Sequence, residues 1–228
     1  MSTLKDNIEI FKDLNTDLGQ VLYGNSKKKS HYDEFWDNFQ QNGTGVVYYG
    51  YAFCNKELWT QEEIEKVKYK HLIANYFAVV FSGNTSITDL SMFTMESYKY
   101  SNGNHAALSF SACFSNCTNL VKCLPINFDF VSSAPNAFNG CAALEELYAS
   151  GTIKFDGLNL KDSPKLSKAS IRSIIDALST TTNKLSITLS SAAVNKAFET
   201  EEGLLDGEFS EAWLNLKADK SNWTIYLA

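Results

Sequence analysis

Five cysteines are the residues of this chain best suited to chemistry. They are Cys54, Cys113, Cys117, Cys123 and Cys141. A thiolate can act as a nucleophile or as a metal ligand, and Cys113 and Cys117 lie close together in the sequence. No second close pair exists, however, and neither His71 nor His105 falls at zinc-finger spacing. An odd number of thiols cannot all pair with one another. We therefore predict free, buried cysteines that pack as small apolar groups, with no metal and no cofactor.

Two pairs of adjacent carboxylates, Glu62-Glu63 and Glu201-Glu202, are the next candidates for acid-base chemistry. Neighbouring side chains diverge on a helix or loop, so these pairs are typical of solvated surfaces. The glycine-rich phosphate loop, His-Glu-x-x-His, Gly-x-Ser-x-Gly and Cys-x-x-Cys patterns do not occur. We predict no catalytic residues. A carbohydrate-active enzyme stays a less favoured alternative, because folding can bring together two carboxylates that are distant in the sequence.

A short motif recurs along the middle of the chain. It occurs as Phe81-x-x-Asn84-x-x-Ile87, Phe114-x-x-Cys117-x-x-Leu120, Phe138-x-x-Cys141-x-x-Leu144 and Leu160-x-x-Ser163-x-x-Leu166. The last three copies follow one another at intervals in the low twenties, a period typical of leucine-rich repeats. The first interval, from Phe81 to Phe114, is longer than one repeat, so it contains either an insertion or a further unit.

The repeated positions predict a core shared between stacked units, because one unit cannot bury its apolar face alone. The cysteine position takes a small, weakly polar group, and we expect Asn84 and Ser163 to replace it by hydrogen bonding to loop backbone. The predicted repeat core consists of Phe81, Ile87, Phe114, Cys117, Leu120, Phe138, Cys141, Leu144, Leu160 and Leu166.

The N-terminal segment predicts a helix with apolar residues at heptad spacing. Its candidate oligomerisation residues are Leu4, Ile8, Phe11, Asn15, Leu18 and Leu22. A single Asn at an a position can fix the register and the number of strands in a coiled coil. Three heptads are few, and an isolated helix of this length is marginal in water. The alternative is an amphipathic helix that lies on its own domain.

The C-terminal segment predicts three helices and two strands. Ser167 caps a helix that runs through Leu178, and Leu185 to Leu189 alternate like a strand. A second helix follows Ser190 or Ser191, a third spans Phe209 to Leu216, and Trp223 to Leu227 form a closing strand. The predicted organisation is a helix and hinge (1–30), an N-terminal capping segment (31–71), repeats (72–166) and an α/β cap (167–228). The expected fold class is an α/β leucine-rich-repeat solenoid with an N-terminal oligomerising helix.

Charge and hydropathy exclude two classes of partner. The net charge is −6, the isoelectric point is about 5.1, and the one dense basic run is Lys27 to Lys29 in a polar connector. Nucleic-acid binders usually carry a basic stripe, so we expect no nucleic-acid partner. No stretch reaches the roughly 20 apolar residues of a membrane span. The N-terminus shows no signal-peptide pattern, which predicts synthesis in the cytoplasm.

The repeat motif resembles the BspA-like class of leucine-rich repeats. The segments Leu166 to Ile171, Ser173 to Ser179, Leu189 to Asn195 and Asn222 to Ile225 are similar to a cap in phage and prophage tail or fibre-like proteins of gut bacteria. Phe35-Trp36-Asp37, Gln41-Asn42-Gly43 and Tyr51-Ala52-Phe53 resemble their N-terminal region. The resemblance covers about residues 31 to 228. It implies a virion-associated protein for display and recognition, with no catalytic residues.

These observations predict a non-enzymatic phage structural or adhesion protein, in a tail or capsid fibre. The expected partners are further copies of the chain, with a trimer favoured as typical of fibres, or another virion protein bound by the N-terminal helix. A host-surface protein or glycan is the expected receptor. The alternative is a cellular bacterial leucine-rich-repeat module for protein–protein interaction.

Tyrosines outside the clearest repeats are the candidate contact residues, since tyrosine combines rigid area with a polar tip. Strand packing is the favoured role for Tyr49 and Tyr51. The segment from Ser97 to Asn104 reads as an exposed loop, so Tyr98 and Tyr100 are the predicted ligand contacts.

Overall fold

The computed structural model describes residues 53–54, 56, 59–66, 70–74, 77–180, 184–198 and 210–228. Several of the predictions concern residues outside these ranges. They are the oligomerisation helix, Tyr49 and Tyr51, the Glu201-Glu202 pair and most of the N-terminal capping segment.

The described chain has a mixed α/β architecture. In order, its elements are α3 (Gln61–Glu65), β1 (His71–Ala74), β2 (Thr94–Ser97), β3 (Leu108–Ser109), β4 (Ile126–Asn127), η1 (Phe128–Phe130), β5 (Val131–Ser133), β6 (Ala149–Ser150), β7 (Leu158–Leu160), α4 (Lys168–Ala177), β8 (Leu185–Leu189), α5 (Ser191–Phe198), α6 (Glu211–Ala218) and β9 (Trp223–Leu227).

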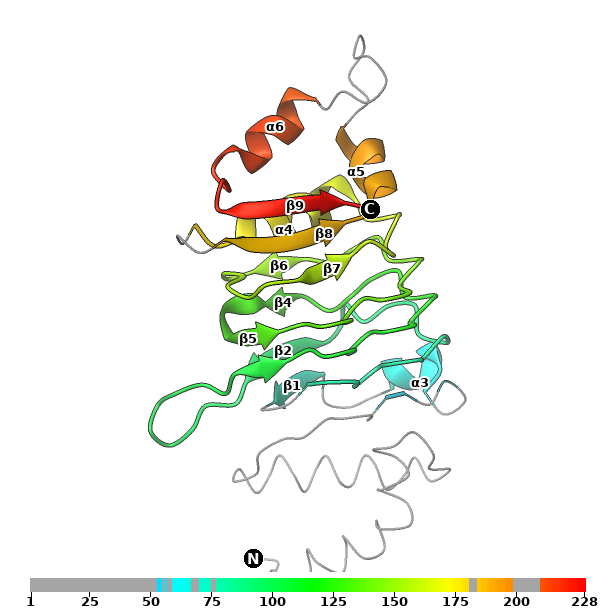
Figure 1. Ribbon diagram of the computed structural model, residues 1–228. Coiled ribbons are helices and arrows are strands. Elements are labelled where there is room, and N and C mark those ends of the chain that lie inside the picture. The colour runs from blue at the N-terminus through cyan, green and yellow to red at the C-terminus, as the bar shows by residue number, and fades with distance from the viewer. Residues whose placement is uncertain are drawn as a thin grey trace, which may run out of the picture.

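The strands form small parallel sheets. β1 pairs with β2, β3 with β5, β4 with β6, and β7, β8 and β9 form a three-stranded sheet. His71 pairs with Thr94 and Ile126 with Ala149, in both cases 23 positions apart. Successive turns of the chain therefore lie on one another (Figure 1), with β1, β2, β4 and β6 following one another up one side and α4 above them.

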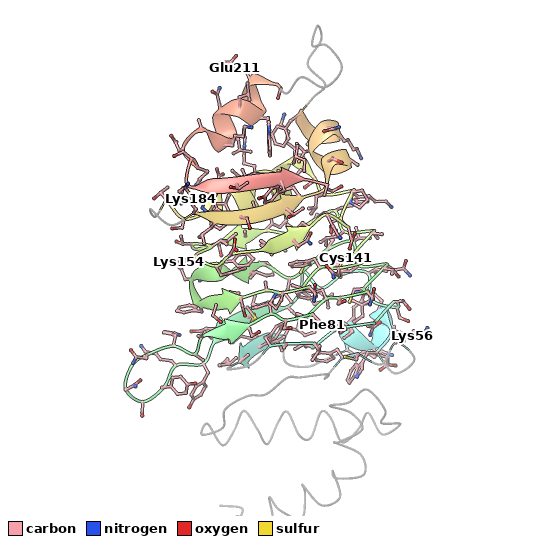
Figure 2. The ribbon with its side chains drawn as sticks, in the orientation of Figure 1. Lys56, Phe81, Cys141, Lys154, Lys184 and Glu211 are labelled. Atoms are coloured by element: carbon pink, nitrogen blue, oxygen red, sulfur yellow. The ribbon has the colours of Figure 1, made fainter. Side chains whose placement is uncertain are left out.

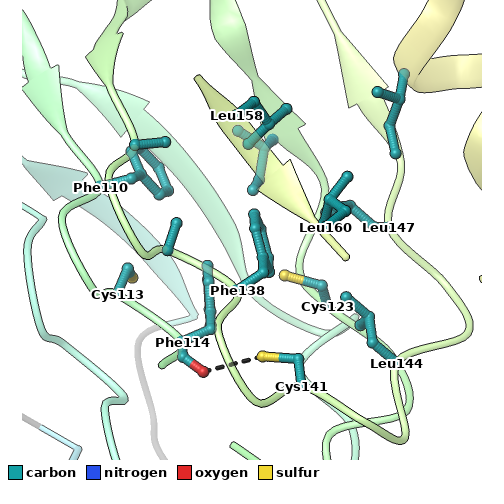
Figure 3. Packing of buried hydrophobic residues seen from close by; sticks show 14 of the residues in the cluster. Phe110, Cys113, Phe114, Cys123, Phe138, Cys141, Leu144, Leu147, Leu158 and Leu160 are labelled. Atoms are coloured by element: carbon teal, nitrogen blue, oxygen red, sulfur yellow. Dashed lines mark hydrogen bonds between the residues drawn. The ribbon is translucent and has the colours of Figure 1, made fainter. Parts of the chain in front are cut away.

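A column of phenylalanine rings runs through the core. Phe81 stacks on Phe114 with ring centroids 5.5 Å apart, and Phe114 on Phe138 at 5.3 Å. Phe53 continues the column on the other side of Phe81, at 5.1 Å. Figure 3 shows Phe114 and Phe138 among the other buried side chains of this region. All ten residues of the predicted repeat core are buried.

The cysteine of each motif bonds to the phenylalanine carbonyl of the preceding motif. Cys117 Sγ donates to the Phe81 carbonyl oxygen at 3.1 Å, and Cys141 Sγ to that of Phe114 at 3.0 Å (Figure 3). Asn84 fills the same position by donating to the Phe53 and Trp59 carbonyls, as expected. The expectation for Ser163 was wrong, because its fully buried hydroxyl has no hydrogen-bond partner among the described residues. A serine side chain is shorter than a cysteine side chain, which accounts for the difference.

Sharp turns between the strands use left-handed backbone conformations. Val79, Ala112 and Asn136 occupy equivalent positions in successive turns, with φ of 53°, 49° and 56°. Asparagine tolerates this region, whereas a β-branched residue such as Val79 rarely adopts it. This corner of the first turn therefore holds strained backbone.

The C-terminal elements match their predictions closely. Ser167 caps α4 by accepting from the Ser170 amide, and β8 and β9 begin and end where the alternation predicts. The third helix begins two positions later than predicted and extends to Ala218, because the Ser210 side chain caps it by accepting from the Trp213 amide. The sheet of β7, β8 and β9 spans the expected boundary between residues 166 and 167, so both sides of that boundary share one core.

Candidate binding surface

A hairpin arm accounts for the long interval between Phe81 and Phe114. It leaves β2 at Tyr98 and returns at Ala106, whose amide donates to the Tyr98 carbonyl at 2.8 Å. Inside it, the Tyr100 amide donates to the Asn104 carbonyl at 2.8 Å. The arm extends away from the stacked strands (Figures 1 and 2). The interval therefore holds an insertion.

Two contacts hold the base of the arm against the core. The buried Ser97 hydroxyl donates to the Ala106 carbonyl at 2.6 Å, which joins the two strands of the arm. The His105 ring stacks on Phe130 of the next turn, with centroids 4.3 Å apart and planes at 22°. The prediction of an exposed loop is confirmed for Lys99 to Asn104, which are all exposed. It was wrong for Ser97, which is buried, and Tyr98 is half-buried.

The predicted contact residues lie together on this arm. The rings of Tyr98 and Tyr100 meet edge to face, with centroids 5.3 Å apart and planes at 80°. Tyr100 is 40% exposed and Tyr98 is half-buried. An edge-to-face pair is a favourable arrangement for aromatic rings and leaves ring area free for a ligand.

The tyrosine pair comes directly after β2 in the chain. Side chains alternate along a strand, and Thr94 and Glu96 are exposed whereas Ser97 is buried. Tyr98, which is half-buried, and Tyr100, which is exposed, come after the end of β2. We use the name tyrosine face for the outward side chains of β1, β2, β4 and β6 together with the tyrosines that flank β2 and β6. It comprises His71, Ile73, Thr94, Glu96, Asn127 and Ser150 on the strands, and Tyr98, Tyr100 and Tyr148 beside them.

Exposed apolar groups gather on the tyrosine face. Within the described ranges, five large apolar or aromatic side chains are exposed, and Ile73, Tyr100 and Tyr148 are three of them. Tyr148 is 43% exposed and directly precedes β6, whose Ala149 pairs with the buried Ile126 of β4. Exposed aromatic groups that gather on one face are typical of recognition sites.

Sequence reasoning missed a polar group on β1 and β2. His71 Nδ1 lies 2.8 Å from Thr94 Oγ1, and His71 Nε2 lies 3.3 Å from Glu96 Oε2. A hydroxyl, an imidazole and a carboxylate in this order could activate a nucleophile. The side chains of His71 and Glu96 are 53% and 52% exposed, however, and charges in such a solvated setting interact weakly. The spacing of His71 and Thr94 is close to the interval between the motifs. This spacing is the sequence feature that could have predicted their contact.

The cysteines are poor nucleophiles. Burial raises the pKa of Cys54 and of Cys141 from 9.0 to about 12, and it also raises the pKa of Cys113, Cys117 and Cys123. All five are free thiols, and all but Cys54 are buried. Thiols that stay protonated at neutral pH serve packing and hydrogen bonding.

The carboxylates of Glu62 and Glu63 lie close to the Lys66 ammonium group. Lys66 Nζ lies 2.6 Å from Glu62 Oε1 and 3.7 Å from Glu63 Oε1 at the end of α3. In the described segments no three His, Cys, Asp or Glu side chains gather as metal ligands. No helix within the same segments is long and apolar enough to span a membrane.

A shallow groove lies where β6 meets α4. Ala149, Ser150 and Gly151 line one side, and Ser173, Asp176 and Ala177 line the other. Its volume is about 340 Å³. The groove adjoins the tyrosine face, because Ser150 belongs to both.

Comparison with known proteins yields no relative: no family model, curated protein or solved structure matches this chain.

Proposed function

We propose that this protein is a non-enzymatic binding protein that presents the tyrosine face to a surface receptor. The observation that carries the proposal is the Tyr98–Tyr100 pair, held on an arm that the His105–Phe130 stack fixes to the core. Rigid tyrosines lose little conformational entropy when a ligand binds. The arm also contains Ser, Asn and Gly residues, a composition that suits adaptable hydrogen bonding.

The scaffold under this surface is, in our proposal, a leucine-rich-repeat solenoid with an α/β C-terminal cap. Three features support it: motif intervals in the low twenties, parallel strand pairs 23 positions apart, and the phenylalanine column. Such scaffolds position loops and faces for binding.

The setting that we propose is a phage virion, as a fibre that contacts gut bacteria. This part rests on the sequence resemblance and on the heptads between Leu4 and Leu22. A cellular interaction module is the competing setting. Light scattering on the full chain and on an Ile8→Asp variant separates them. An oligomer that dissociates in the variant favours the fibre, and a monomer in both cases contradicts it.

Receptor binding is tested on cell envelopes from a panel of gut bacteria. The full chain should bind at least one envelope, and the variant with Tyr98→Ser and Tyr100→Ser should bind it about tenfold more weakly. Tyr226→Ser is the matched control, because Tyr226 is 56% exposed on β9, outside the tyrosine face. Equal loss in both variants, or an equal loss of melting temperature and binding in the double variant, contradicts the proposal.

A further inference from the structure

The turn of the hairpin arm contains an asparagine followed by a glycine, Asn102-Gly103. Both residues are exposed, and Gly103 has a left-handed backbone with φ of 85°. A β-carbon at Gly103 would meet nothing within 4 Å, so this part of the turn is open to solvent. Glycine has no side chain to hinder the approach of its amide nitrogen to a neighbouring group. The asparagine amide carbon before it is therefore open to attack by that nitrogen.

The side chain of Asn102 is held over the peptide that would attack it. Its Oδ1 atom accepts a hydrogen bond from the Asn104 amide at 3.0 Å. A bond to the amide two residues further on folds an asparagine side chain back along its own backbone. The Asn104 amide also points at the oxygen on which negative charge would develop, at a distance suited to an oxyanion donor.

One hydrogen bond opposes the attack. The Gly103 amide donates to the Tyr100 carbonyl at 2.9 Å, and it must lose its proton before the nitrogen can react. This bond therefore has to open first. It lies in the exposed turn of the arm, and hydrogen bonds in exposed turns open at a low cost in free energy.

A second Asn-Gly pair, Asn139-Gly140, lies in a packed corner and provides an internal comparison. The Gly140 amide donates to Asp162 Oδ2 at 3.0 Å, and the negative charge of this carboxylate opposes removal of the amide proton. The Asn139 carbonyl accepts from the Asn116 amide at 2.7 Å, and Asn139 Nδ2 donates to Asn136 Oδ1 at 3.1 Å. A β-carbon at Gly140 would lie 2.7 Å from Asn116 Oδ1. The same dipeptide is thus fixed here and open on the arm.

We propose that Asn102 is a site of spontaneous deamidation. The Gly103 nitrogen loses its proton to hydroxide and attacks Asn102 Cγ, which forms a C–N bond and places an oxyanion on Oδ1. The bond between Cγ and Nδ2 then breaks, and Nδ2 takes a proton from water and leaves as ammonia, which regenerates hydroxide. Water opens the resulting succinimide ring at either of its carbonyl carbons, which leaves aspartate or isoaspartate. The net reaction consumes one water and releases one ammonia.

Deamidation changes both the charge and the backbone of the arm. It adds a carboxylate to a segment, Tyr98 to Asn104, that holds Lys99 and no acidic residue. In isoaspartate the backbone gains a carbon atom between Tyr100 and Asn104, which hydrogen bond across the turn at 2.8 Å. The product should therefore lose that register and shift the exposed Tyr100 ring. The reaction needs no receptor, so it is independent of the proposed function.

The test incubates the full chain at pH 8 in water enriched in heavy oxygen, once folded and once in guanidinium chloride. Peptide mapping by tandem mass spectrometry follows Asn102 and Asn139. Each deamidated peptide should contain one heavy oxygen atom, because water supplies the new carboxylate oxygen. In the folded chain Asn102 should react about tenfold or more faster than Asn139, which local structure protects. In denaturant the two rates should agree within about threefold, since glycine follows both residues.

An Asn102→Gln variant is the matched control. It keeps an amide at an exposed position, so the melting temperature should not change, but ring closure would need a larger ring. The arm should then stay unmodified over the same time. Arm deamidation that continues in this variant would place the reaction at Asn104 and overturn the proposal.

Two results in the parent chain would also overturn it. One is equal protection of Asn102 and Asn139 in the folded state. The other is a folded-state rate at Asn102 that is about tenfold or more below its rate in denaturant. That result would show that the bond from the Gly103 amide to the Tyr100 carbonyl protects the turn.

Discussion

His105 stacks on Phe130 across two successive turns of the chain, at a centroid distance of 4.3 Å. The two residues lie in different elements: His105 closes the hairpin arm, and Phe130 ends η1. The His105 Nδ1 atom also lies 3.2 Å from the Ser97 carbonyl oxygen. One imidazole therefore joins the arm to β2 and to the neighbouring turn.

Replacing His105 with Ala should loosen the arm and leave the core intact. Hydrogen exchange should accelerate at the amides of Tyr100 and Ala106, which hydrogen bond within the arm. The Phe114 amide, bonded to the Ala137 carbonyl in the core, is the internal control and should exchange unchanged. Unaltered exchange at Tyr100 would show that the stack does not hold the arm.

Ser163→Cys should stabilise the protein. The thiol should reach the Phe138 carbonyl as Cys141 reaches that of Phe114, and it replaces a buried hydroxyl that has no partner among the described residues. A net gain of about 1 kcal/mol in the free energy of unfolding is expected, measured by urea denaturation. Cys141→Ser is the reciprocal control and should lose a similar amount. A destabilised Ser163→Cys variant would refute this account of the position.

The burial of the motif residues and the C-terminal elements could be predicted because their signals are local. The spacing of Phe114, Cys117 and Leu120 marks a buried face, and Ser167 marks the start of the helix that follows it directly. The start of α6 was missed by two positions because Ser210 and Phe209 are both compatible with the pattern. Local patterns identify elements well but fix their ends less well.

Contacts between turns could not be read from the sequence in the same way. His71, Thr94 and Glu96 meet because β1 and β2 pair in one particular register, and that register depends on contacts between residues that are distant in the sequence. The same holds for His105 on Phe130 and for the position of Tyr148 beside β4. The arm makes the interval between Phe81 and Phe114 longer than the intervals between the later motifs. Because of this irregular spacing, the register of the strands could not be predicted from the motif.

Val79→Asn should relieve strain at the first left-handed corner. Val79 has φ of 53°, and Asn136 already occupies the equivalent corner at 56°. The left-handed conformation costs a residue with a β-carbon about 1–2 kcal/mol, and asparagine reduces that cost. We expect the midpoint of thermal unfolding to rise by roughly 2–4 °C. Asn136→Val should lower it, and a rise in that variant would contradict the explanation.

Gly151→Ala should destabilise the protein more than Gly157→Ala. Both glycines have positive φ, 67° and 78°, so both variants are strained. A β-carbon at Gly151 would also lie 2.3 Å from Asn127 Oδ1 and 2.8 Å from Asp129 Oδ2, whereas at Gly157 it would meet nothing within 4 Å. The difference in unfolding free energy should be about 1–3 kcal/mol, the range for overpacking. Equal losses would show that Asn127 and Asp129 move aside freely.

The buried thiols should make stability fall in alkaline solution. Burial raises the pKa of Cys54 in the folded protein from 9.0 to about 12, so the folded state keeps its proton where the unfolded state loses it. The stabilising contribution is therefore complete below pH 9 and is lost as the pH rises toward 12. At pH 10.5 one such thiol should cost about 2 kcal/mol. Urea midpoints at pH 7.5 and 10.5 measure the loss.

A Cys54→Ala variant provides the control for that loss, because it removes one thiol while the lysines and tyrosines still titrate. Its stability should decrease less between the two pH values than that of the parent chain. Alkylation of Cys54 at pH 8 should also be about a thousandfold slower in the folded protein than in urea, since the thiolate fraction falls with the raised pKa. Rapid alkylation of native Cys54, or an identical pH dependence in Cys54→Ala, would show that this thiol ionises freely in the fold.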